Sequence, residues 1–323
     1  MNFSFGPPFA LASPPPFTDE GEIHVWLFDP RACDVDEPRV LDFAKCSLSE
    51  EELRAGASKA NSNDRIHYYL SKMFVRTVLC GYVPHETKMA RCMQFKRESF
   101  GKPTLVATTS DAVGTLEFNL SHTRSLMALA VTRGSHLGID VESTARDVQG
   151  DPRRLARRYF SKREYEAMFG LPVRDAWPGW SILGDSERLL HHWTLKESFA
   201  KATGLGISRT GLSSLSFSFL PSTSLHANGP ASVDVQFEVK SHKILSQEVA
   251  KYSFFHYHVD EEHILSLCCG PMSESSSNRT YGPAHIVFFR TPHASPPGHR
   301  FVTREVTLLA FKRARTTLSP CAP

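Results

Sequence analysis

The chain has 323 residues, which is enough for one large domain or two of ordinary size. Its hydrophobic share of 41%, charged share of 22% and net charge of +3 are those of an ordinary soluble globular protein, and they call for neither nucleic acid nor a membrane as partner. No apolar run approaches the ~20 residues of a membrane span, and seven cysteines without a Cys-x-x-Cys pair favour reduced thiols in the cytoplasm over disulfides or structural zinc.

The N-terminal part of the chain predicts a lead-in, a strand and a long helix. Residues 1–20 are rich in proline and lack the charged and apolar regions of a signal peptide, so we expect a disordered segment. Residues 23–28 are β-branched and aromatic and end at Asp29-Pro30, which is typical of a strand. Residues 64–79 carry apolar side chains at spacings of three and four, which predicts a helix.

The middle of the chain predicts both strands and helices. Residues 137–142 predict a strand of alternating character, and residues 152–168 a basic helix. Residues 170–184 are rich in Gly, Pro and Trp and predict a loop, after which residues 185–203 form a clear helix that stops at Gly204. Further strand-like segments are 118–122, 126–131, 214–220, 233–239, 251–259 and 263–269.

The C-terminal segment, residues 271–323, differs in composition from the rest. It begins with a serine-rich stretch, continues with a basic tail and contains two short apolar runs, 286–289 and 306–309. We expect a loosely attached or poorly ordered extension, to which the sequence assigns no function.

Two carboxylates stand close together in Gly138-Ile139-Asp140-Val141-Glu142. On a strand, Asp140 and Glu142 point to the same face while their neighbours point to the other. Adjacent carboxylates repel each other unless a cation lies between them, and oxygen ligands suit Mg²⁺. A solvated edge strand with two surface acids is an equally good interpretation of this motif alone.

A second motif places a tryptophan, an acid and a lysine on one helix face. Trp193, Glu197 and Lys201 are spaced by four residues. A surface Glu–Lys pair would explain the last two, but the tryptophan on the same stripe indicates that the stripe is partly covered.

Two shorter motifs offer groups that bind phosphate. Ser121-His122 at a strand end presents a hydroxyl and an imidazole, and Lys102 is held between Gly101 and Pro103 in a turn. Adjacent Ser and His cannot easily form a nucleophile–base pair, and no Gly-x-Ser-x-Gly elbow is present, so a serine hydrolase is disfavoured.

In this order, the four motifs resemble those of the surfactin-type (Sfp-like) 4′-phosphopantetheinyl transferases. Segments 75–79 and 158–165 also look like that family, and the resemblance covers roughly residues 22–270. It departs from the family at Thr123-Arg124, where a small residue and Gly are common.

The resemblance implies an α+β fold with a pseudo-two-fold arrangement: two similar α/β halves with the active site at their interface. On this basis we expect an N-terminal half at 21–133 and a C-terminal half at 134–270 that carries the magnesium site.

The resemblance also implies a reaction and the residues that perform it. The phosphopantetheine arm of coenzyme A would pass to a serine of an apo carrier protein, leaving 3′,5′-ADP. Mg²⁺ would be held by Asp140, Glu142 and Glu197; Glu197 would also take the serine proton, and Lys201 would stabilise the departing group. The residues expected at coenzyme A are Lys102, Ser121, His122, Asp140, Lys201 and, at the start of the early helix, Arg65.

The implied partners are acyl, peptidyl or aryl carrier domains of fatty-acid, polyketide or non-ribosomal peptide synthesis, and the family implies a monomer. The basic segment 153–163, with Tyr159 and Phe160 exposed beside it, is a candidate docking site for an acidic carrier domain; an ordinary solvated helix explains it equally well. Two other functions remain open: an Mg²⁺-dependent hydrolase of coenzyme A or another nucleotide pyrophosphate, and a non-catalytic binder of coenzyme A or carrier protein.

Overall fold

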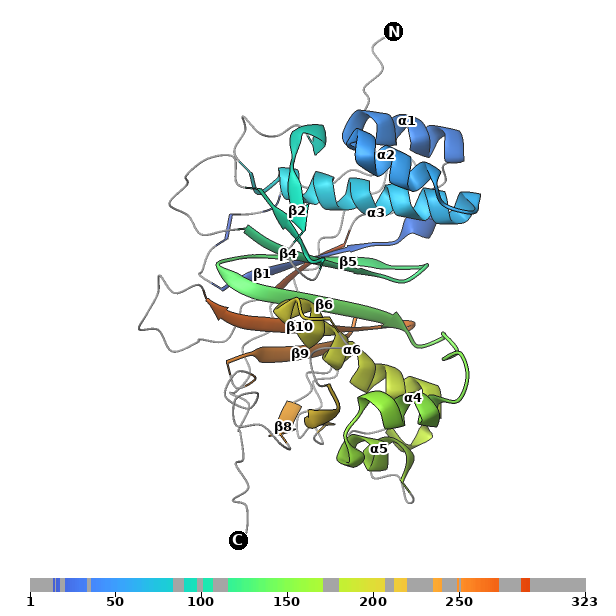
Figure 1. Ribbon diagram of the computed structural model, residues 1–323, viewed down its shortest axis with the longest axis vertical. Helices are drawn as coiled ribbons and strands as arrows, with labels where there is room; N and C mark the ends of the chain where they lie inside the picture. The colour runs from blue at the N-terminus through green and yellow to red at the C-terminus, as the bar shows by residue number, and fades with distance from the viewer. Residues whose placement is uncertain are drawn as a thin grey trace. The chain divides into compact units, whose positions relative to one another are not determined.

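In the computed structural model, the chain folds into two compact units (Figure 1). The first unit takes in residues 1–99, 103–134 and 285–308, and the second takes in residues 100–102, 135–284 and 309–323. The structure describes residues 14, 16–17, 21–33, 36–83, 90–97, 101–106, 116–170, 180–206, 212–219, 235–239, 249, 251–272 and 286–290. Most of the expected lead-in 1–20, of the expected loop 170–184 and of the tail 271–323 therefore lies outside the described residues.

In the first unit, helices cover a four-stranded sheet of order β11-β1-β5-β4 (Figure 1). The helices and the sheet enclose one hydrophobic core, in which Phe74 and Leu129 are fully buried. The elements of this unit are β1 (Ile23–Phe28), η1 (Pro30–Ala32), α1 (Glu37–Ser47), α2 (Glu50–Ala57), α3 (Ser62–Cys80), η3 (Ala90–Cys92), β2 (Phe95–Arg97), β3 (Pro103–Leu105), β4 (Leu116–His122), β5 (Met127–Arg133) and β11 (Ile286–Arg290).

The helix predicted at 64–79 is confirmed as α3. The side chain of Asn61 caps it by accepting a hydrogen bond from the backbone N–H of Asp64, and the apolar positions of the predicted stripe face the core. The strand predicted at 23–28 is β1, which is buried along its whole length because α3 covers one face and further strands flank it.

The structure differs from the expectation of a loosely attached tail at residues 286–290. These residues form β11, which pairs in parallel with β1, so that Ile286 lies opposite Ile23. Ile286 is buried, and the ring of Phe289 stacks on that of Trp26 with centroids 4.3 Å apart. An apolar run of β-branched and aromatic residues satisfies the free edge of β1, which is the physical reason that it does not remain in solvent.

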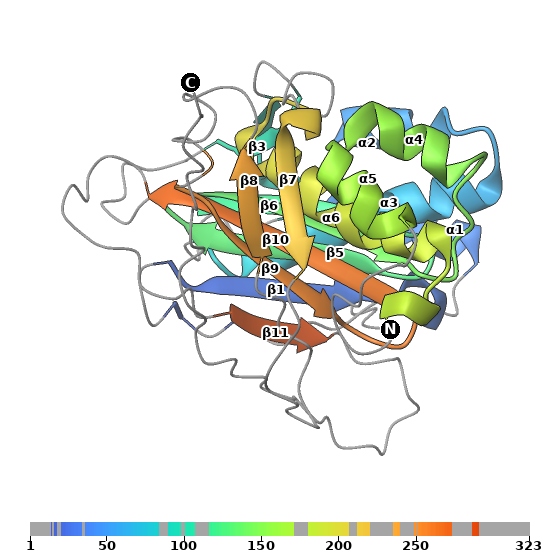
Figure 2. The ribbon, with the colours of Figure 1, turned by 90° about the horizontal axis from the view of Figure 1, so that it is seen from below.

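In the second unit, a three-stranded sheet of order β6-β10-β9 packs against α6 (Figure 2). A second cluster of buried side chains joins α6 to α4, α5 and β7, which pairs with β8 in a two-stranded ribbon. The elements of this unit are β6 (Ser135–Ser143), α4 (Pro152–Tyr159), α5 (Lys162–Phe169), η4 (Trp180–Ile182), α6 (Asp185–Thr203), η5 (Leu212–Ser214), β7 (Leu215–Phe219), β8 (Val235–Val239), β9 (Ser253–His258) and β10 (His263–Met272).

The helix predicted at 185–203 is confirmed as α6, and Gly204 ends it in a left-handed conformation with φ of 69°. Both α3 and α6 have 19 residues. None of the helices that the structure describes combines the length and the apolar character needed to span a bilayer.

The single basic helix predicted at 152–168 is wrong, because the structure holds two helices there. Phe160 is extended and ends α4, and Ser161 starts α5 with a capping box in which its side chain accepts from the Glu164 N–H while the Glu164 carboxylate accepts from the Ser161 N–H. These two bonds satisfy helix-end groups that a continuous helix would have paired internally, so the chain can restart at a new angle.

Candidate active site

The two carboxylates of the first motif lie on β6, the edge strand of the three-stranded sheet. Asp140 and Glu142 are only 5% and 8% exposed, so the alternative of two solvated surface acids is wrong. Arg146 donates to Glu142 Oε2 at 2.6 Å. Burial nevertheless raises the pKa of Glu142, with a further rise from the charge of Asp140 that Arg146 partly opposes.

The second motif lies on α6, which packs against β6 and β10. Trp193, Glu197 and Lys201 are half-buried on a helix that is otherwise mostly buried, as the tryptophan in the stripe predicted. Lys201 Nζ donates to Asp140 Oδ1 at 2.7 Å. Burial and the charge of Asp140 raise the pKa of Glu197 to about 7, although Lys201 lowers it. The carboxylates of β6 and α6 therefore share one electrostatic environment.

A glycine makes this approach of helix and strand possible. A Cβ at Gly138 would overlap the backbone carbonyl oxygen of Ser198 and come within 2.4 Å of the backbone nitrogen of Ala202. Only a residue without a side chain lets α6 lie so close to β6, so Gly138 fixes the separation of the two elements that carry the acidic residues.

The chemistry of these donors suits a divalent cation. Asp140, Glu142 and Glu197 supply only oxygen, and burial, with a further contribution from the charge of Asp140, raises the pKa of both glutamates. This is the donor set that Mg²⁺ prefers. Among the described residues no three Asp, Glu, His or Cys side chains are already arranged as a coordination shell; Lys201 and Arg146 neutralise Asp140 and Glu142 instead. The donors fit the ion by their chemistry, and ligation would require these two cations to release them.

Lys102 belongs to the same unit but is not presented to solvent. Its side chain is buried, and Nζ donates to the carbonyl oxygen of Leu137 at 3.2 Å, one residue before Gly138. The predicted turn is present, because Gly101 has a φ of +89° that a glycine adopts without strain.

Three candidate residues lie in the first unit. Ser121 and His122 end β4; the former is buried and the latter exposed. Arg65 on α3 binds the carboxylate of Glu37 through two guanidinium nitrogens, so its charge is already paired within the unit. His67 lies two residues after Arg65 on α3, and the centroid of its ring is 4.8 Å from that of His122. Sequence reasoning missed His67, because only the fold brings α3 to the end of β4.

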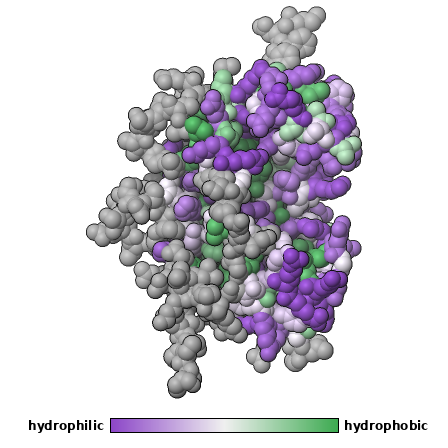
Figure 3. Space-filling view, in the orientation of Figure 1, coloured by the Kyte–Doolittle hydropathy of each residue, from purple (hydrophilic) through white to green (hydrophobic). Residues whose placement is uncertain are grey.

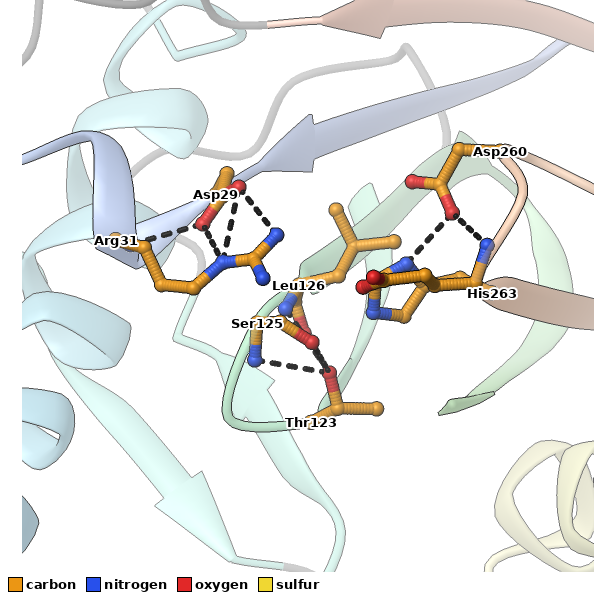
Figure 4. A network of polar contacts seen from close by, with 8 residues as sticks. Asp29, Arg31, Thr123, Ser125, Leu126, Asp260 and His263 are labelled. Carbon is orange, nitrogen blue, oxygen red and sulfur yellow. Dashed lines mark hydrogen bonds and ion pairs between the residues drawn. The ribbon is translucent and has the colours of Figure 1, made fainter. Parts of the chain in front are cut away.

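The loop after His122 is a tight turn (Figure 4). The hydroxyl oxygen of Thr123 accepts hydrogen bonds from the backbone N–H groups of Ser125 and Leu126, at 3.2 and 2.9 Å. The carbonyl oxygen of Thr123 lies 2.9 Å from Nε2 of His67. Thr123, a departure from the family pattern, therefore orders the loop that carries His122.

Comparison with known proteins connects these residues to one reaction class. Residues 136–268 match the 4′-phosphopantetheinyl transferase superfamily. The 4′-phosphopantetheinyl transferase HetI of Nostoc sp. is 31% identical over 200 residues, which cover 62% of this chain and 76% of that protein. The chain belongs to this superfamily. The fold and the transferase activity that the sequence predicted are confirmed.

Other relatives of this transferase match over a shorter length. The L-aminoadipate-semialdehyde dehydrogenase-phosphopantetheinyl transferase of Rattus norvegicus is 27% identical over 180 residues, 54% of this chain and 52% of that protein. The 4′-phosphopantetheinyl transferase psf-1 of Bacillus pumilus is 32% identical over 139 residues, 42% of this chain and 51% of that protein. The chain thus spans about half the length of these two relatives.

The lysine beside Glu197 has a structural role that sequence reasoning missed. Lys196 is fully buried and forms an ion pair with Glu164 at 2.9 Å, and its Nζ also donates to the carbonyl oxygens of Leu212 and Leu215, both at 2.5 Å. Three acceptors satisfy the three N–H groups of the ammonium. The motif of the transferase therefore holds one lysine that secures α6 to α5 and β7 and a second, Lys201, that reaches the carboxylates.

Proposed function

We propose that this transferase is of the surfactin type and moves the 4′-phosphopantetheine arm of coenzyme A to a serine of an apo carrier protein with the aid of Mg²⁺. The observation that supports the proposal best is the meeting of Asp140, Glu142, Glu197 and Lys201 on two packed elements within the matched residues. A pure binder of coenzyme A has no need of three acids and a lysine in one place.

In this proposal, Asp140, Glu142 and Glu197 would hold the metal ion. The ion, when bound, supplies positive charge that offsets the charge developing on the pyrophosphate during transfer. Glu197 accepts the proton of the carrier serine hydroxyl, since it is the acid of the set that lies on the half-buried face of α6. Lys201 leaves Asp140 and binds the departing 3′,5′-ADP, which it stabilises by its charge.

The phosphates of coenzyme A require cationic and hydroxyl groups as partners. We assign them to Lys102, Ser121 and His122, with Arg65 as a further candidate. Since Arg65 is paired with Glu37, it would have to exchange that carboxylate for a phosphate. His122 is exposed at the end of β4, where a phosphate from solvent can approach its imidazole.

For the carrier protein we propose a docking surface on α4. Arg153, Arg154, Arg157 and Arg158 are exposed, and hydrophilic side chains gather over α4 and α5 on the visible face (Figure 3). Carrier domains are acidic helical bundles in this family, so the charges are complementary. The expected apolar anchor is wrong in one respect: Phe160 is 4% exposed because it packs in the core of the second unit, so it cannot contact a partner.

We further propose a monomer that acts in the cytoplasm. The monomer is supported by the family, which builds its site within one chain. The cytoplasm is supported by the six cysteines that the structure describes, all of which are free thiols.

Intact-protein mass spectrometry of an apo carrier domain tests the proposal. After incubation with coenzyme A and Mg²⁺, the carrier should gain one phosphopantetheine arm, and EDTA or Asp140→Ala should abolish the gain. Loss of coenzyme A without any gain on several carriers would favour a pyrophosphate hydrolase. Glu197→Gln separates a transferase from a binder: it should stop turnover while coenzyme A still binds.

A further inference from the structure

Four polar side chains form a closed ring of hydrogen bonds beneath α6. His191 Nδ1 lies 2.8 Å from His256 Nε2, His256 Nδ1 lies 2.9 Å from Ser266 Oγ, and Ser266 Oγ donates to Thr194 Oγ1 at 2.8 Å. Thr194 Oγ1 in turn donates to the carbonyl oxygen of His191 at 3.1 Å. All four residues are at most 2% exposed, so the ring is shielded from water.

The proton count fixes the direction of every bond in this ring. A hydroxyl has one proton, and those of Ser266 and Thr194 are used toward Thr194 and the His191 carbonyl. Ser266 must therefore accept from Nδ1–H of His256, which leaves Nε2 of that ring to accept from Nδ1–H of His191. The assignment requires the imidazole of His256 to be neutral, because its Nε2 accepts, whereas His191 only donates through Nδ1–H. Burial, which lowers the pKa of both imidazoles, favours the neutral state.

The ring lies on the same row of the sheet as a candidate metal ligand. Ser266 on β10 is directly opposite Asp140 on β6 and directly opposite His256 on β9, so the three side chains point to one face. That face is the one α6 covers, because Gly138, two residues before Asp140, meets the backbone of Ser198.

The helix side of this interface consists of one histidine and three small residues. His191, Thr194, Ser198 and Ala202 follow one another at spacings of three and four and are all buried. On the face of α6 toward the sheet, Ser198 donates only within the helix and Ala202 is apolar, so neither makes a directional bond to the sheet; Lys196 holds the helix toward α5 and β7. A small shift of α6 against the sheet would lengthen the hydrogen bonds of the ring beyond the distance at which they are effective. The ring is therefore the part of this interface that favours one position of α6.

We propose that this ring positions the catalytic groups of the transferase, an inference that rests on the proposed function. His191 and Thr194 bind the sheet about one to three turns before Glu197 and Lys201 on the same rigid helix. The ring thereby sets the register of α6 on the sheet and with it the place of Glu197 and Lys201 relative to Asp140. Its members touch no substrate and are positioning residues.

Removing one hydroxyl of the ring tests this role against a matched control. Ser266→Ala and Thr194→Val each break a bond between α6 and the sheet. Ser198→Ala removes a hydroxyl from the same face of α6, but one that donates only to the Leu195 carbonyl within α6. Thr194→Ser keeps the ring hydroxyl and is the conservative rescue.

The kinetic readout is kcat and KM, measured per folded molecule well below each melting temperature. We expect Ser266→Ala and Thr194→Val each to lower kcat about tenfold, because small misplacements of catalytic groups cost rates of this order or more. KM for coenzyme A and for the carrier should not change. The double variant should be no worse than either single one, because both remove the same bond. Thr194→Ser and Ser198→Ala should retain kcat.

An unchanged kcat in folded Ser266→Ala and Thr194→Val, or an equal loss in Ser198→Ala, would overturn the positioning role.

Hydrogen–deuterium exchange gives a measurement that does not depend on activity. The α6 amides from 193 to 203 should exchange faster in Ser266→Ala than in the wild type or Ser198→Ala, and equal protection in all three would also overturn the ring's hold on α6. If the wild type transfers nothing, the proposed function fails, and the exchange arm still decides whether the ring fixes α6. If Thr194→Val does not fold, Thr194→Ser and Ser266→Ala carry the same comparison.

Discussion

The buried imidazole of His192, next to the polar ring, leads us to predict that a substitution at this position stabilises the protein. His192 on α6 is 1% exposed and lies among aromatic rings, with Trp180 stacked 5.8 Å away and the ring of Phe219 at 4.7 Å. Neither of its ring nitrogens has a hydrogen-bond partner among the residues that the structure describes. A buried polar group without a partner costs about 1–3 kcal/mol. Replacing the imidazole by an apolar side chain of similar volume should therefore stabilise the protein.

We expect His192→Leu to raise the free energy of unfolding by about 1 kcal/mol at pH 7, since the loss of aromatic contacts, about 0.5–1.5 kcal/mol, offsets part of the gain. The advantage should grow in acid. Burial lowers the pKa of His192 well below its ordinary value of 6.5, and the charges of Lys196 on the same helix and of His256 on β9 act in the same direction.

The sign follows from proton binding in the two states. Below pH 6.5 the unfolded chain binds a proton at this histidine while the folded chain does not, so wild-type stability falls as the pH falls. At 1.36 kcal/mol per pH unit, the loss between pH 7 and pH 5 is about 2 kcal/mol for a folded pKa below 5. The variant lacks this loss, so its advantage should reach about 3 kcal/mol at pH 5.

Urea unfolding at pH 7 and pH 5 measures both parts. All other titrating groups, including the glutamates whose raised pKa acts in the opposite direction, are common to both proteins and cancel in the difference. His192→Gln is the matched control: it cannot titrate but keeps an unpaired amide, so it should show the same growth in acid without the gain at pH 7. A difference that is equal at the two pH values would refute the reasoning, as would a His192→Leu variant that is less stable at pH 7.

Three further predictions concern other parts of the chain. Lys196→Met should lower the free energy of unfolding by about 3–5 kcal/mol in urea titration, because it leaves the Glu164 carboxylate buried without its cation. Adding Glu164→Gln to this variant should restore part of the lost stability. If the two substitutions change the free energy of unfolding independently of each other, the ion pair does not act as proposed. Arg157→Glu with Arg158→Glu should raise KM for the carrier protein about tenfold or more and leave KM for coenzyme A alone, whereas an unchanged carrier KM would exclude docking on α4. Phe289→Ala should lower the free energy of unfolding by roughly 2 kcal/mol, since the ring it removes is half-buried against an indole; an unchanged urea midpoint would show that β11 contributes nothing.

Elements with strong local signals could be predicted from the sequence. The 19 residues of α6 are followed by Gly204, which ends the helix in a left-handed conformation, and β1 is a short β-branched and aromatic run with a proline after it. The break between α4 and α5 was also visible, because Ser161 and Glu164 have the spacing of a capping box. The basic residues on both sides concealed it, since they continue across the junction without a change in character.

The pairing of β11 with β1 could not be predicted. The apolar run at 286–289 is a strand signal, but a strand does not carry the identity of its partner, and β1 lies at the other end of the sequence. Parallel pairing between distant segments depends on which sheet edge is free after the rest of the unit has folded. Composition in the flanking residues pointed instead to a detached tail.

The site shows the same division between local and distant information. The spacing of Asp140 and Glu142 on a strand, and of Glu197 and Lys201 on a helix, predicted which side chains share a face. It could not predict that Gly138 lets the two elements come together, nor that Lys201 reaches Asp140. The burial of the acids, which sets their pKa, arises from that packing and has no signal in the local sequence.

The two lysines of α6 show how packing assigns different roles to one residue type. Lys196 has all three of its N–H groups engaged by Glu164 and two backbone carbonyls in a site with no access to water. Moving it would leave those acceptors and a buried carboxylate unsatisfied, so it is suited to hold α6 and unsuited to follow a substrate. Lys201 is half-buried and is bound to Asp140, the carboxylate that a divalent ion would also bind. Lys201, whose ion pair with Asp140 is partly exposed, would exchange that carboxylate for an anionic phosphate when Asp140 holds a divalent ion. The chemistry of the proposed reaction therefore depends on the lysine whose ion pair can be exchanged, while the register that places it depends on the lysine and the polar ring whose bonds cannot.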